Sequence, residues 1–577
     1  MTPSVDHWPA ALVQVDEGRR WLALDDAAEE IRASRAEDVA TALDRVEQRT
    51  RECGWHAAGF VAYEAGAAFG LAACPPRAGL PLVWFTLFRR ARVVDRLPVV
   101  AESSAAVGVP EPSLSRQAFA SAIGRIREHL RDGDTYQVNF TFALRGAFAG
   151  DARALWTDLV RAQRCRYAAF MHCDSLAICS ASPELFFSRA GDELTARPMK
   201  GTAPRGRTVA EDEALAAELA SSDKTRAENV MIVDMVRNDL GRVAEVGSVH
   251  VPELCVVERY PNVLQMVSSV AARSRASLAR IFAAVHPSAS ITGAPKVRTM
   301  EIIRAIEDGP RGVYTGAVGW VAPDGRAQFN VAIRTAVVDE RRGTIEYGVG
   351  AGIVWDSDAA GEYDESLLKA RVLTDPPPAF DLLETLRWSP ERGFALLDRH
   401  LSRLAASARH FGFPCDLADL RRVLDSAVAG QRDRRRVRVL LQSDGTARAE
   451  TTPLEAGPRR VPIRLAPQPV DVSTPFVFHK TTYRRAYEAA QGGEPGEVVF
   501  WNADGEITES TNANVVVDRD GDLVTPPVAC GLLAGTARAA LLDRGRIREA
   551  IVTVGEFQQA RRVWVVNSVR GWRRACL

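Results

Sequence analysis

Two lysines lie in sequence settings that could support chemistry. Lys200 is inside Arg197-Pro-Met-Lys-Gly-Thr-Ala-Pro-Arg205, where Pro and Gly force a turn and Thr202 is close by. Lys480 follows the apolar run Pro475–Phe478, which we expect to be a short strand. A lysine becomes a nucleophile when burial or neighbouring cations lower its pKa. Taken singly, each lysine is better explained as a solvated residue on the surface.

Acidic residues recur at helical spacing in the first part of the chain. Glu228 and Asp239 share one face of a helix that a serine cap and the apolar spacing predict over residues 222–240. A carboxylate on an apolar stripe needs a cation or a hydrogen-bonding partner. An ion pair of Glu228 with Arg237 or Arg242 is the structural alternative.

A second acidic pair, Glu362 and Glu365, lies one helical turn apart and faces one way. Glu365 also precedes Lys369 by four residues, which is an ordinary helix-stabilising spacing. Oxygen ligands that are hard and few suit magnesium better than zinc. The pattern therefore indicates either a magnesium site or a helix surface.

The second part of the chain holds a carboxylate and a glycine turn besides Lys480. Glu509 lies in Gly505–Asn514, and Gly535-Thr536 opens a helix predicted over Ala537–Asp543. Helix N-termini with a free hydroxyl bind phosphate. A lysine, a carboxylate and a phosphate-binding turn are what pyridoxal phosphate requires. The alternatives are a surface lysine, a strand-edge glutamate and an ordinary helix start.

These residues must be positioned by at least two domains, because single cores stop growing at roughly 250–300 residues and the chain has 577. Three consecutive prolines predict an extended linker over 376–380. We therefore expect domains at 1–375 and 381–577. The fold class is predicted to be α+β, because residues 313–321 and 327–338 resemble antiparallel strands. Arg334 on the second of these strands should meet an anion, best a bidentate carboxylate.

The composition excludes several classes of partner. Lys plus Arg and Asp plus Glu both number 73, so the neutral chain has no global reason to bind nucleic acid or an anionic membrane. The nine cysteines form no CxxC pair, and the start of the chain does not resemble a signal peptide. No apolar stretch approaches the roughly 20 residues of a membrane span. We expect a cytoplasmic protein without nucleic-acid or membrane partners.

The order of motifs over about residues 55–373 resembles the chorismate-utilising enzymes. Lys-Gly-Thr, Glu-Asn-x-Met-x-x-Asp, Thr-Gly-Ala-Pro-Lys, Ile-Arg-Thr and Gly-Ala-Gly with Glu-x-x-Glu follow one another as in that family. The resemblance implies a large layered domain that binds magnesium through Glu228, Glu362 and Glu365. It also implies chorismate contacts at Gly201, Thr202, Thr292, Tyr314, Arg334, Gly350, Ala351 and Gly352.

Lys200 distinguishes among members of this family. The anthranilate- and isochorismate-forming members usually have a small residue there, whereas the aminodeoxychorismate-forming members have Lys-Gly-Thr. In those members the lysine is thought to attack ring carbon C2 as the C4 hydroxyl leaves, after which ammonia adds at C4. Gln265 stands where relatives often have His, so the proton donor to the hydroxyl has no assigned residue. No cysteine lies in a glutaminase-like elbow, which implies a separate glutamine amidotransferase subunit that supplies ammonia.

Residues 380–577 resemble the fold-type IV pyridoxal-phosphate enzymes. Lys480 matches their Schiff-base lysine and Glu509 the partner of the pyridine nitrogen. Gly535 and Thr536 match the phosphate turn, and Arg403 the phosphate-binding arginine. The smaller second domain is short for this family.

The two resemblances together predict one pathway. The first domain would convert chorismate and ammonia to 4-amino-4-deoxychorismate, and the second would eliminate pyruvate to give 4-aminobenzoate for folate synthesis. Two alternatives remain for the second domain: an aminotransferase, or a non-catalytic docking module for the glutaminase subunit.

Overall fold

The computed structural model describes residues 8–16, 20–98, 104–376, 378–458, 460–493 and 495–576. The chain divides into two compact units. The first holds the chain up to Ala203 and Ala217–Pro377, and the second holds Pro204–Ala216 and the chain from Pro378 onward. The expected boundary at 376–380 assigns Pro204–Ala216 to the first domain. In the structure this segment packs with the second unit instead.

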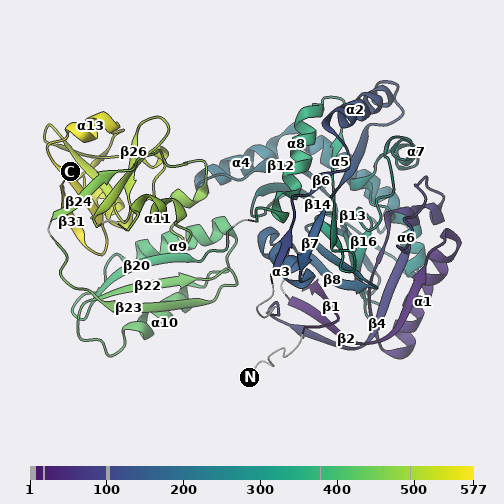
Figure 1. Ribbon diagram of the computed structural model, residues 1–577. Coiled ribbons are helices and arrows are strands. Elements are labelled where there is room, and N and C mark those ends of the chain that lie inside the picture. Colours follow the sequence, from purple (N-terminus) through teal and green to yellow (C-terminus); the bar gives the residue numbers. More distant parts are fainter. Residues whose placement is uncertain are drawn as a thin grey trace. The chain divides into compact units, whose positions relative to one another are not determined.

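In the first unit, strands β1–β11 and β13–β19 pair antiparallel with their neighbours. Pairing runs without a break from β7 through β19, β18, β9, β8, β1, β2, β4, β3, β16, β17 and β10 to β11, β14 and β13. Figure 1 shows this sheet as the centre of the first unit, with helices against it. The strand bounds are β1 Ala11–Val15, β2 Arg20–Ala33, β3 His56–Val61, β4 Val83–Val94, β5 Ala105–Val107, β6 Glu111–Pro112, β7 Gln137–Gly150, β8 Tyr167–Cys173, β9 Leu176–Ser182, β10 Leu185–Ala190, β11 Glu193–Arg197, β12 Met199–Pro204, β13 His250–Arg259, β14 Val263–Arg273, β15 Gly293–Ala294, β16 Ala317–Val321, β17 Ala327–Val331, β18 Thr335–Asp339 and β19 Thr344–Ile353.

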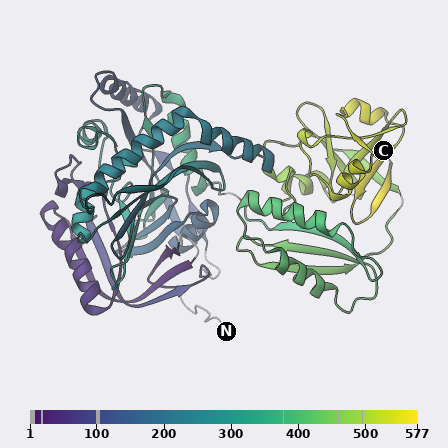
Figure 2. The ribbon, with the colours of Figure 1, turned by 180° about the vertical axis from the view of Figure 1, so that it is seen from behind.

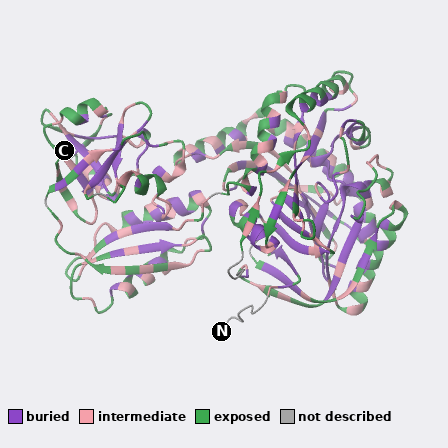
Figure 3. Cartoon of the chain, viewed as in Figure 1, coloured by how far each residue is buried: buried purple, intermediate pink, exposed green. Residues whose placement is uncertain are grey.

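Helices cover this sheet and give the first unit the expected layers. One apolar layer lies under α1, α5 and α6, a second under α2, α3 and α8, and a third between the strands themselves. The buried residues concentrate on the strands (Figure 3). The helix bounds are α1 Val39–Cys53, α2 Arg116–Arg131, α3 Ala152–Gln163, α4 Val209–Ser221, α5 Asp223–Gly241, α6 Leu278–Val285, α7 Lys296–Ile306 and α8 Ala359–Ala370.

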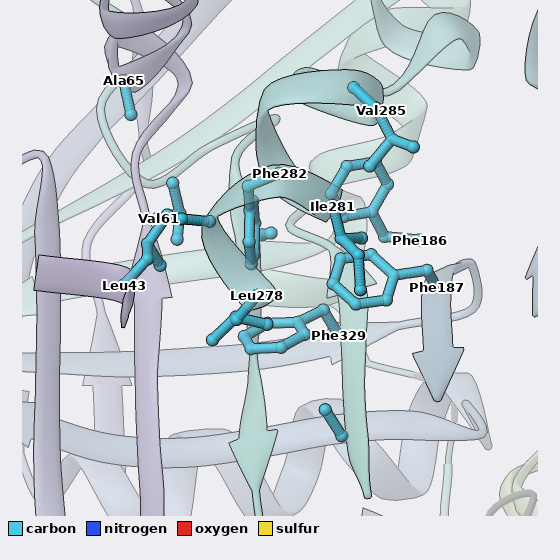
Figure 4. Close-up of a cluster of buried hydrophobic side chains, with 14 of the residues drawn as sticks. Leu43, Val61, Ala65, Phe186, Phe187, Leu278, Ile281, Phe282, Val285 and Phe329 are labelled. Atoms are coloured by element: carbon cyan, nitrogen blue, oxygen red, sulfur yellow. The ribbon is translucent and has the colours of Figure 1, made fainter. Parts of the chain in front are cut away.

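The apolar character of α6 fixes one of these layers. Phe282 is fully buried and lies against Phe187 and Phe329, with ring centroids 5.3 and 5.1 Å away. Figure 4 shows these rings converging from the helix and two strands. Aromatic edge-to-face contacts of this kind add to the free energy gained by burial. The helix is thereby held against the strands that lead to the Lys200 turn.

The second unit combines two sheets. β20, β21, β22 and β23 are antiparallel, and α9 and α10 pack their apolar residues on one face of this sheet (Figure 2). The other sheet is mixed, because β24 lies parallel to both β25 and β31. The bounds are β20 Leu382–Ser389, β21 Gly393–Phe394, β22 Arg435–Leu441, β23 Ala447–Pro453, β24 Arg460–Leu465, β25 Glu497–Trp501, β26 Ile507–Ser510, β27 Asn514–Arg519, β28 Asp522–Thr525, β29 Arg548–Glu549, β30 Val563–Asn567, β31 Gly571–Cys576, α9 Leu397–Phe411, α10 Leu417–Val428, α11 Arg485–Gln491, α12 Thr536–Asp543 and α13 Val554–Gln559.

Two predicted strands differ from the structure. Residues 327–338 form two strands, because Arg334 adopts a left-handed φ of 53° that ends the first pairing and lets β18 join β9. Pro475–Val477 is a 3-10 helix in place of a strand, since Pro475 starts it and the Thr474 hydroxyl accepts the Phe476 N–H. The helix predicted over 222–240 is confirmed as α5, with the Ser222 side chain capping the Thr225 N–H.

The structure also bears on membrane association. Within the described residues, no helix is both long and apolar enough to cross a bilayer.

Candidate functional site

Lys200 lies where β12, α5 and β19 meet. Its Nζ is 3.5 Å from a carboxylate oxygen of Glu228, and both side chains are partly exposed. A Cβ placed on Gly352 of β19 would lie 3.2 Å from the same Nζ. The partner of Glu228 is therefore Lys200, and the predicted alternatives Arg237 and Arg242 do not fill that role. The fold therefore brings the Lys200 amine, the Glu228 carboxylate and Gly352 of β19 close together.

The turn that carries Lys200 is held from both sides. Gly201 has a φ of +104°, and a Cβ there would lie 2.2 Å from the Thr225 methyl, so glycine is required. The Asn229 amide donates to the Lys200 carbonyl at 3.1 Å. The Gln265 amide donates to the Gly201 carbonyl at 2.8 Å and accepts from the Thr202 hydroxyl at 3.0 Å. Asn229 and Gln265 thus fix the backbone on which the lysine is presented.

A buried ion pair secures the helix that supplies Glu228. Lys296 Nζ lies 2.5 Å from Asp239 and donates to the Val285 carbonyl at 3.1 Å. Burial lowers the pKa of Lys296, although the Asp239 carboxylate opposes this. Lys296, the lysine of Thr-Gly-Ala-Pro-Lys, therefore stabilises the position of α5, and its described hydrogen bonds do not reach the turn around Lys200.

The remaining predicted chorismate contacts are spread along β19 and the loops beside it. Arg334 donates to the Lys369 carbonyl at 2.6 Å, so its described partner is a backbone oxygen and not the carboxylate expected from the sequence. Burial raises the pKa of Tyr314, whose ring lies 2.1 Å from a Cβ built on Gly348. Thr292 is fully buried and donates to the Ser288 carbonyl.

The three carboxylates predicted to bind magnesium do not form one cluster. Glu362 accepts from the Ser357 hydroxyl at 2.8 Å, and Glu365 pairs with Lys369 at 3.0 Å. Lys369 also donates to the Gly350 carbonyl at 2.9 Å, which anchors α8 on β19. Among the residues that the structure describes, no three acidic, histidine or cysteine side chains converge as metal ligands would. As arranged, these residues do not fit a magnesium ion, and no chemical step is assigned to one.

Glu184 is a candidate that the sequence reasoning missed. Its carboxyl is fully surrounded, accepts from the Ser290 hydroxyl at 2.6 Å and hydrogen-bonds the backbone of Met199. Burial raises its pKa to about 7, so it can hold a proton near neutral pH. The signal was a charged residue between apolar strands, in Ser182-Pro-Glu184. Through its hydrogen bond to the Met199 backbone, the Glu184 carboxyl contacts the residue that precedes Lys200.

Lys480 of the second unit lies where its two sheets meet. Its carbonyl accepts from the Leu383 N–H of β20 at 3.0 Å. Burial lowers the pKa of its amine to about 8, and the charges of Arg403 and Arg484 act in the same direction. A lysine with this pKa is partly neutral at physiological pH, as a nucleophilic amine must be.

Glu509 lies near Lys480, and the pKa of its carboxyl is raised. The carboxyl is buried and accepts from the Tyr487 hydroxyl at 2.8 Å. Burial raises its pKa to about 7, although Tyr487, Arg484 and Lys480 oppose this. It can therefore share a proton with a basic nitrogen near neutral pH. Tyr487 and Arg484 were not anticipated from the sequence.

A buried polar network ties α9 to the start of α12. Glu384 is 1% exposed, accepts from Arg403 through both oxygens at 2.8 Å, and lies 2.7 Å from His400 Nδ1. Arg403 also donates to the Ala534 carbonyl at 3.0 Å, and His400 Nε2 lies 3.2 Å from the Thr536 hydroxyl. Burial opposes ionisation of Glu384, but Arg403 and His400 lower its pKa to about 2. The network fixes the predicted phosphate turn.

This donor set fits pyridoxal phosphate. Gly535 caps α12, and a Cβ there would lie 1.9 Å from the Asn514 amide oxygen, so only glycine fits the turn. A partly neutral lysine, a carboxyl that exchanges a proton near pH 7, and a helix N-terminus beside an arginine match what the cofactor needs.

Comparison with known proteins identifies a family match for each unit. Residues 9–375 match the family described as chorismate binding enzyme, and the chain belongs to that family. Residues 381–576 match amino-transferase class IV, which makes the second unit a fold-type IV aminotransferase-like domain.

The relatives align with the first unit. An anthranilate synthase component 1 from Haloarcula marismortui is 43% identical over 46% of this chain and 54% of its own length. An aminodeoxychorismate synthase component 1 from Klebsiella aerogenes is 42% identical over 44% of this chain and 57% of its own. The chain thus spans about half the length of these relatives.

A solved structure shares the fold of the first unit. Anthranilate synthase component I from Streptococcus pneumoniae superposes with a TM-score of 0.54 at 24% identity, over 63% of this chain and 93% of that chain.

Removing the charge of Glu384 should destabilise the second unit in a pH-dependent way. Because folding lowers the pKa of Glu384 from 4.5 to about 2, its ionised form stabilises the fold above pH 4.5, and this contribution is lost as the pH falls toward 2. Glu384→Gln should lower the free energy of unfolding by about 3 kcal/mol near neutral pH. Thermal unfolding at neutral and acidic pH measures this.

Glu450→Gln is the matched control, because that carboxylate is half-exposed and 3.9 Å from Arg438. A Glu384→Gln deficit that stays the same size from neutral to strongly acidic pH would contradict the proposed ionisation.

Proposed function

We propose that the first unit converts chorismate and ammonia to 4-amino-4-deoxychorismate, and that the second unit eliminates pyruvate from this product to give 4-aminobenzoate, a folate precursor. The observation that carries the first assignment is the Lys200 amine, held 3.5 Å from Glu228 and against Gly352. The likeness to aminodeoxychorismate synthase component 1 supports it.

Each group around Lys200 has a part in the first reaction. Glu228 takes the proton that leaves Lys200 neutral, and the amine then bonds to C2 of chorismate as the C4 hydroxyl departs. Glu184, holding a proton near neutral pH, delivers it to that hydroxyl, which leaves as water. Ammonia adds at C4 and the C2–lysine bond breaks. Thr202 and Arg334 are proposed to bind the substrate, with Thr292, Tyr314 and Gly350–Gly352 around it.

The proposal includes a glutamine amidotransferase as a separate partner that supplies ammonia. Because Glu228, Glu362 and Glu365 do not converge as metal ligands in the described residues, the proposal includes no magnesium ion and no step above depends on one. The isolated chain should use ammonium directly.

In the second unit, pyridoxal phosphate would be held by Lys480, by Glu509 at its pyridine nitrogen, and by Arg403 with the Gly535-Thr536 turn at its phosphate. When bound, this cofactor supplies an electron sink for a carbanion next to an amine. Lys480 is the base that removes the C4 proton, because burial leaves its amine partly neutral at physiological pH. Loss of the C3 enolpyruvyl group as pyruvate makes the ring aromatic.

An aminotransferase or a docking module remains the alternative for the second unit. Supplying 4-amino-4-deoxychorismate and measuring pyruvate separates these: pyruvate release indicates a lyase, amino-group transfer to a keto acid indicates an aminotransferase, and absence of bound cofactor indicates docking.

Lys200→Ala should reduce aminodeoxychorismate formation by about a hundredfold or more, while chorismate binding changes little, because only the bond-forming amine is removed. Product formation from chorismate and ammonium, and chorismate affinity by calorimetry, measure the two effects. Lys224→Ala is the matched control, since Lys224 is exposed and pairs with Asp356. Equal losses in affinity and rate would argue against covalent catalysis.

Glu184→Gln should slow the first reaction by about 10²–10⁴-fold, because glutamine keeps the shape and cannot donate the proton. The pH profile of chorismate consumption should lose the limb that reflects a group titrating near pH 7. If the variant keeps the part of the pH profile that titrates near pH 7, a residue other than Glu184 is responsible for that titration.

Lys480→Ala should uncouple the two reactions. The variant should consume chorismate normally, accumulate 4-amino-4-deoxychorismate and release pyruvate about 10²–10⁴-fold more slowly, because both anchor and base are lost. Chromatography and a pyruvate assay follow the products, and Lys200→Ala serves as the reciprocal control. Formation of 4-aminobenzoate at the wild-type rate would refute the assignment of the second unit.

A further inference from the structure

A segment from within the chorismate-binding stretch is built into the second unit. Pro204–Ala216 begins four residues after Lys200 and includes the start of α4, yet it packs with the chain beyond Pro378. The contacts of this segment inside the second unit are mostly polar and part-buried.

Arg205 and Asp212 form the centre of this segment. Their side chains are 9% and 3% exposed, and Arg205 Nε lies 2.6 Å from the Asp212 carboxylate. The Gly206 N–H donates to the same carboxylate at 3.1 Å, and a Cβ on Gly206 would lie 2.2 Å from the Asp212 nitrogen. Buried pairs of this kind hold a fixed geometry, because breaking one leaves an uncompensated charge.

The segment reaches the chain that leads into Lys480 from two directions. Arg205 donates to the carbonyl of His410 at 2.5 Å, and the His410 ring stacks on His479 with centroids 4.3 Å apart. Arg207 donates to the Val472 carbonyl at 3.3 Å, and its guanidinium lies 5.3 Å from the centre of the Phe478 ring. Both contacts bear on the residues immediately before Lys480.

His479 links these contacts to Lys480, because it stacks on His410 and directly precedes Lys480 in the chain. Its Nδ1 lies 2.9 Å from the Ser407 hydroxyl, and the side chain is 6% exposed. Burial lowers the pKa of His479 to about 3, with His410 acting in the same direction. The imidazole is therefore neutral at physiological pH and acts as a fixed spacer between α9 and Lys480.

We propose that Pro204–Ala216 is a positioning segment for Lys480: Arg207 holds Val472 and Phe478 directly, and Arg205 holds His410, which stacks on His479. The site of the second unit is then complete only with this piece of the chorismate-binding stretch. The inference rests on the proposed function in that Lys480 is taken as the reactive lysine. Arg205 and Arg207 touch neither substrate nor cofactor and act through His479 and Phe478.

The test uses the full-length chain with Arg205→Ala, which removes both the ion pair and the bond to the His410 carbonyl. Hydrogen exchange of the peptide covering residues 475–483, measured without added cofactor, should become faster in the variant. Pyruvate release from supplied 4-amino-4-deoxychorismate should fall on the order of tenfold to a hundredfold, because small displacements of a reactive group are costly. Supplying this substrate bypasses the first unit.

Arg205→Lys and Arg207→Ala extend the test. Arg205→Lys keeps the positive charge opposite Asp212, so this variant should recover most of the exchange protection and of the rate of pyruvate release. Such recovery would show that the loss in Arg205→Ala comes from the missing contact and not from misfolding. Arg207→Ala should speed exchange in 475–483 through the separate Val472 and Phe478 contacts. Glu213→Gln, a change of an exposed residue in the same segment, is the control.

The outcomes separate the two ideas. Unchanged exchange in 475–483 together with pyruvate release within about twofold of wild type in Arg205→Ala would overturn the positioning role. If the wild-type chain releases no pyruvate, the proposed lyase fails, whereas the exchange measurement still decides whether Pro204–Ala216 holds Lys480 in place.

Discussion

A lysine is a better nucleophile or base when partial burial favours its neutral amine. Both candidate sites hold a lysine that is partly or fully buried. Keeping an amine in such a place requires the surrounding backbone to be fixed by other polar groups, since the amine itself destabilises a buried position. Lys200 is presented by a turn that Asn229 and Gln265 hold. Lys480 is presented by residues that stack, through His479, on α9.

The two units meet the constraint with different chemistry around the amine. Beside Lys200 the nearest charge is the Glu228 carboxylate, and Glu184 offers a proton-holding carboxyl in backbone contact with the preceding residue. Beside Lys480 the dominant charges are the guanidiniums of Arg403 and Arg484, which favour the neutral amine. Lys200 therefore has a carboxylate within reach that could accept a proton, whereas the guanidiniums beside Lys480 lower the pKa of its amine.

Membership of the chorismate binding enzymes and the class IV aminotransferase-like second unit place two recognised folds on one chain. The connection between them is more than the proline-rich linker. Pro204–Ala216 belongs to the first family in sequence and to the second unit in packing. The packing of the second unit therefore includes residues from the stretch that matches the chorismate binding enzymes.

The sequence by itself determined the elements with strong local signals and the residue types that carry chemistry. The Ser222 cap and apolar spacing identified α5, and the glycine turns identified the loops around Lys200 and Thr536, because capping and turn chemistry act over a few residues. Only the tertiary structure decided which partner each charge finds. Glu228 meets Lys200, Asp239 meets Lys296 and Arg334 meets a backbone carbonyl, since burial and long-range pairing set these contacts. The same holds for Glu184 and Pro204–Ala216, whose surroundings come from segments far apart in the chain.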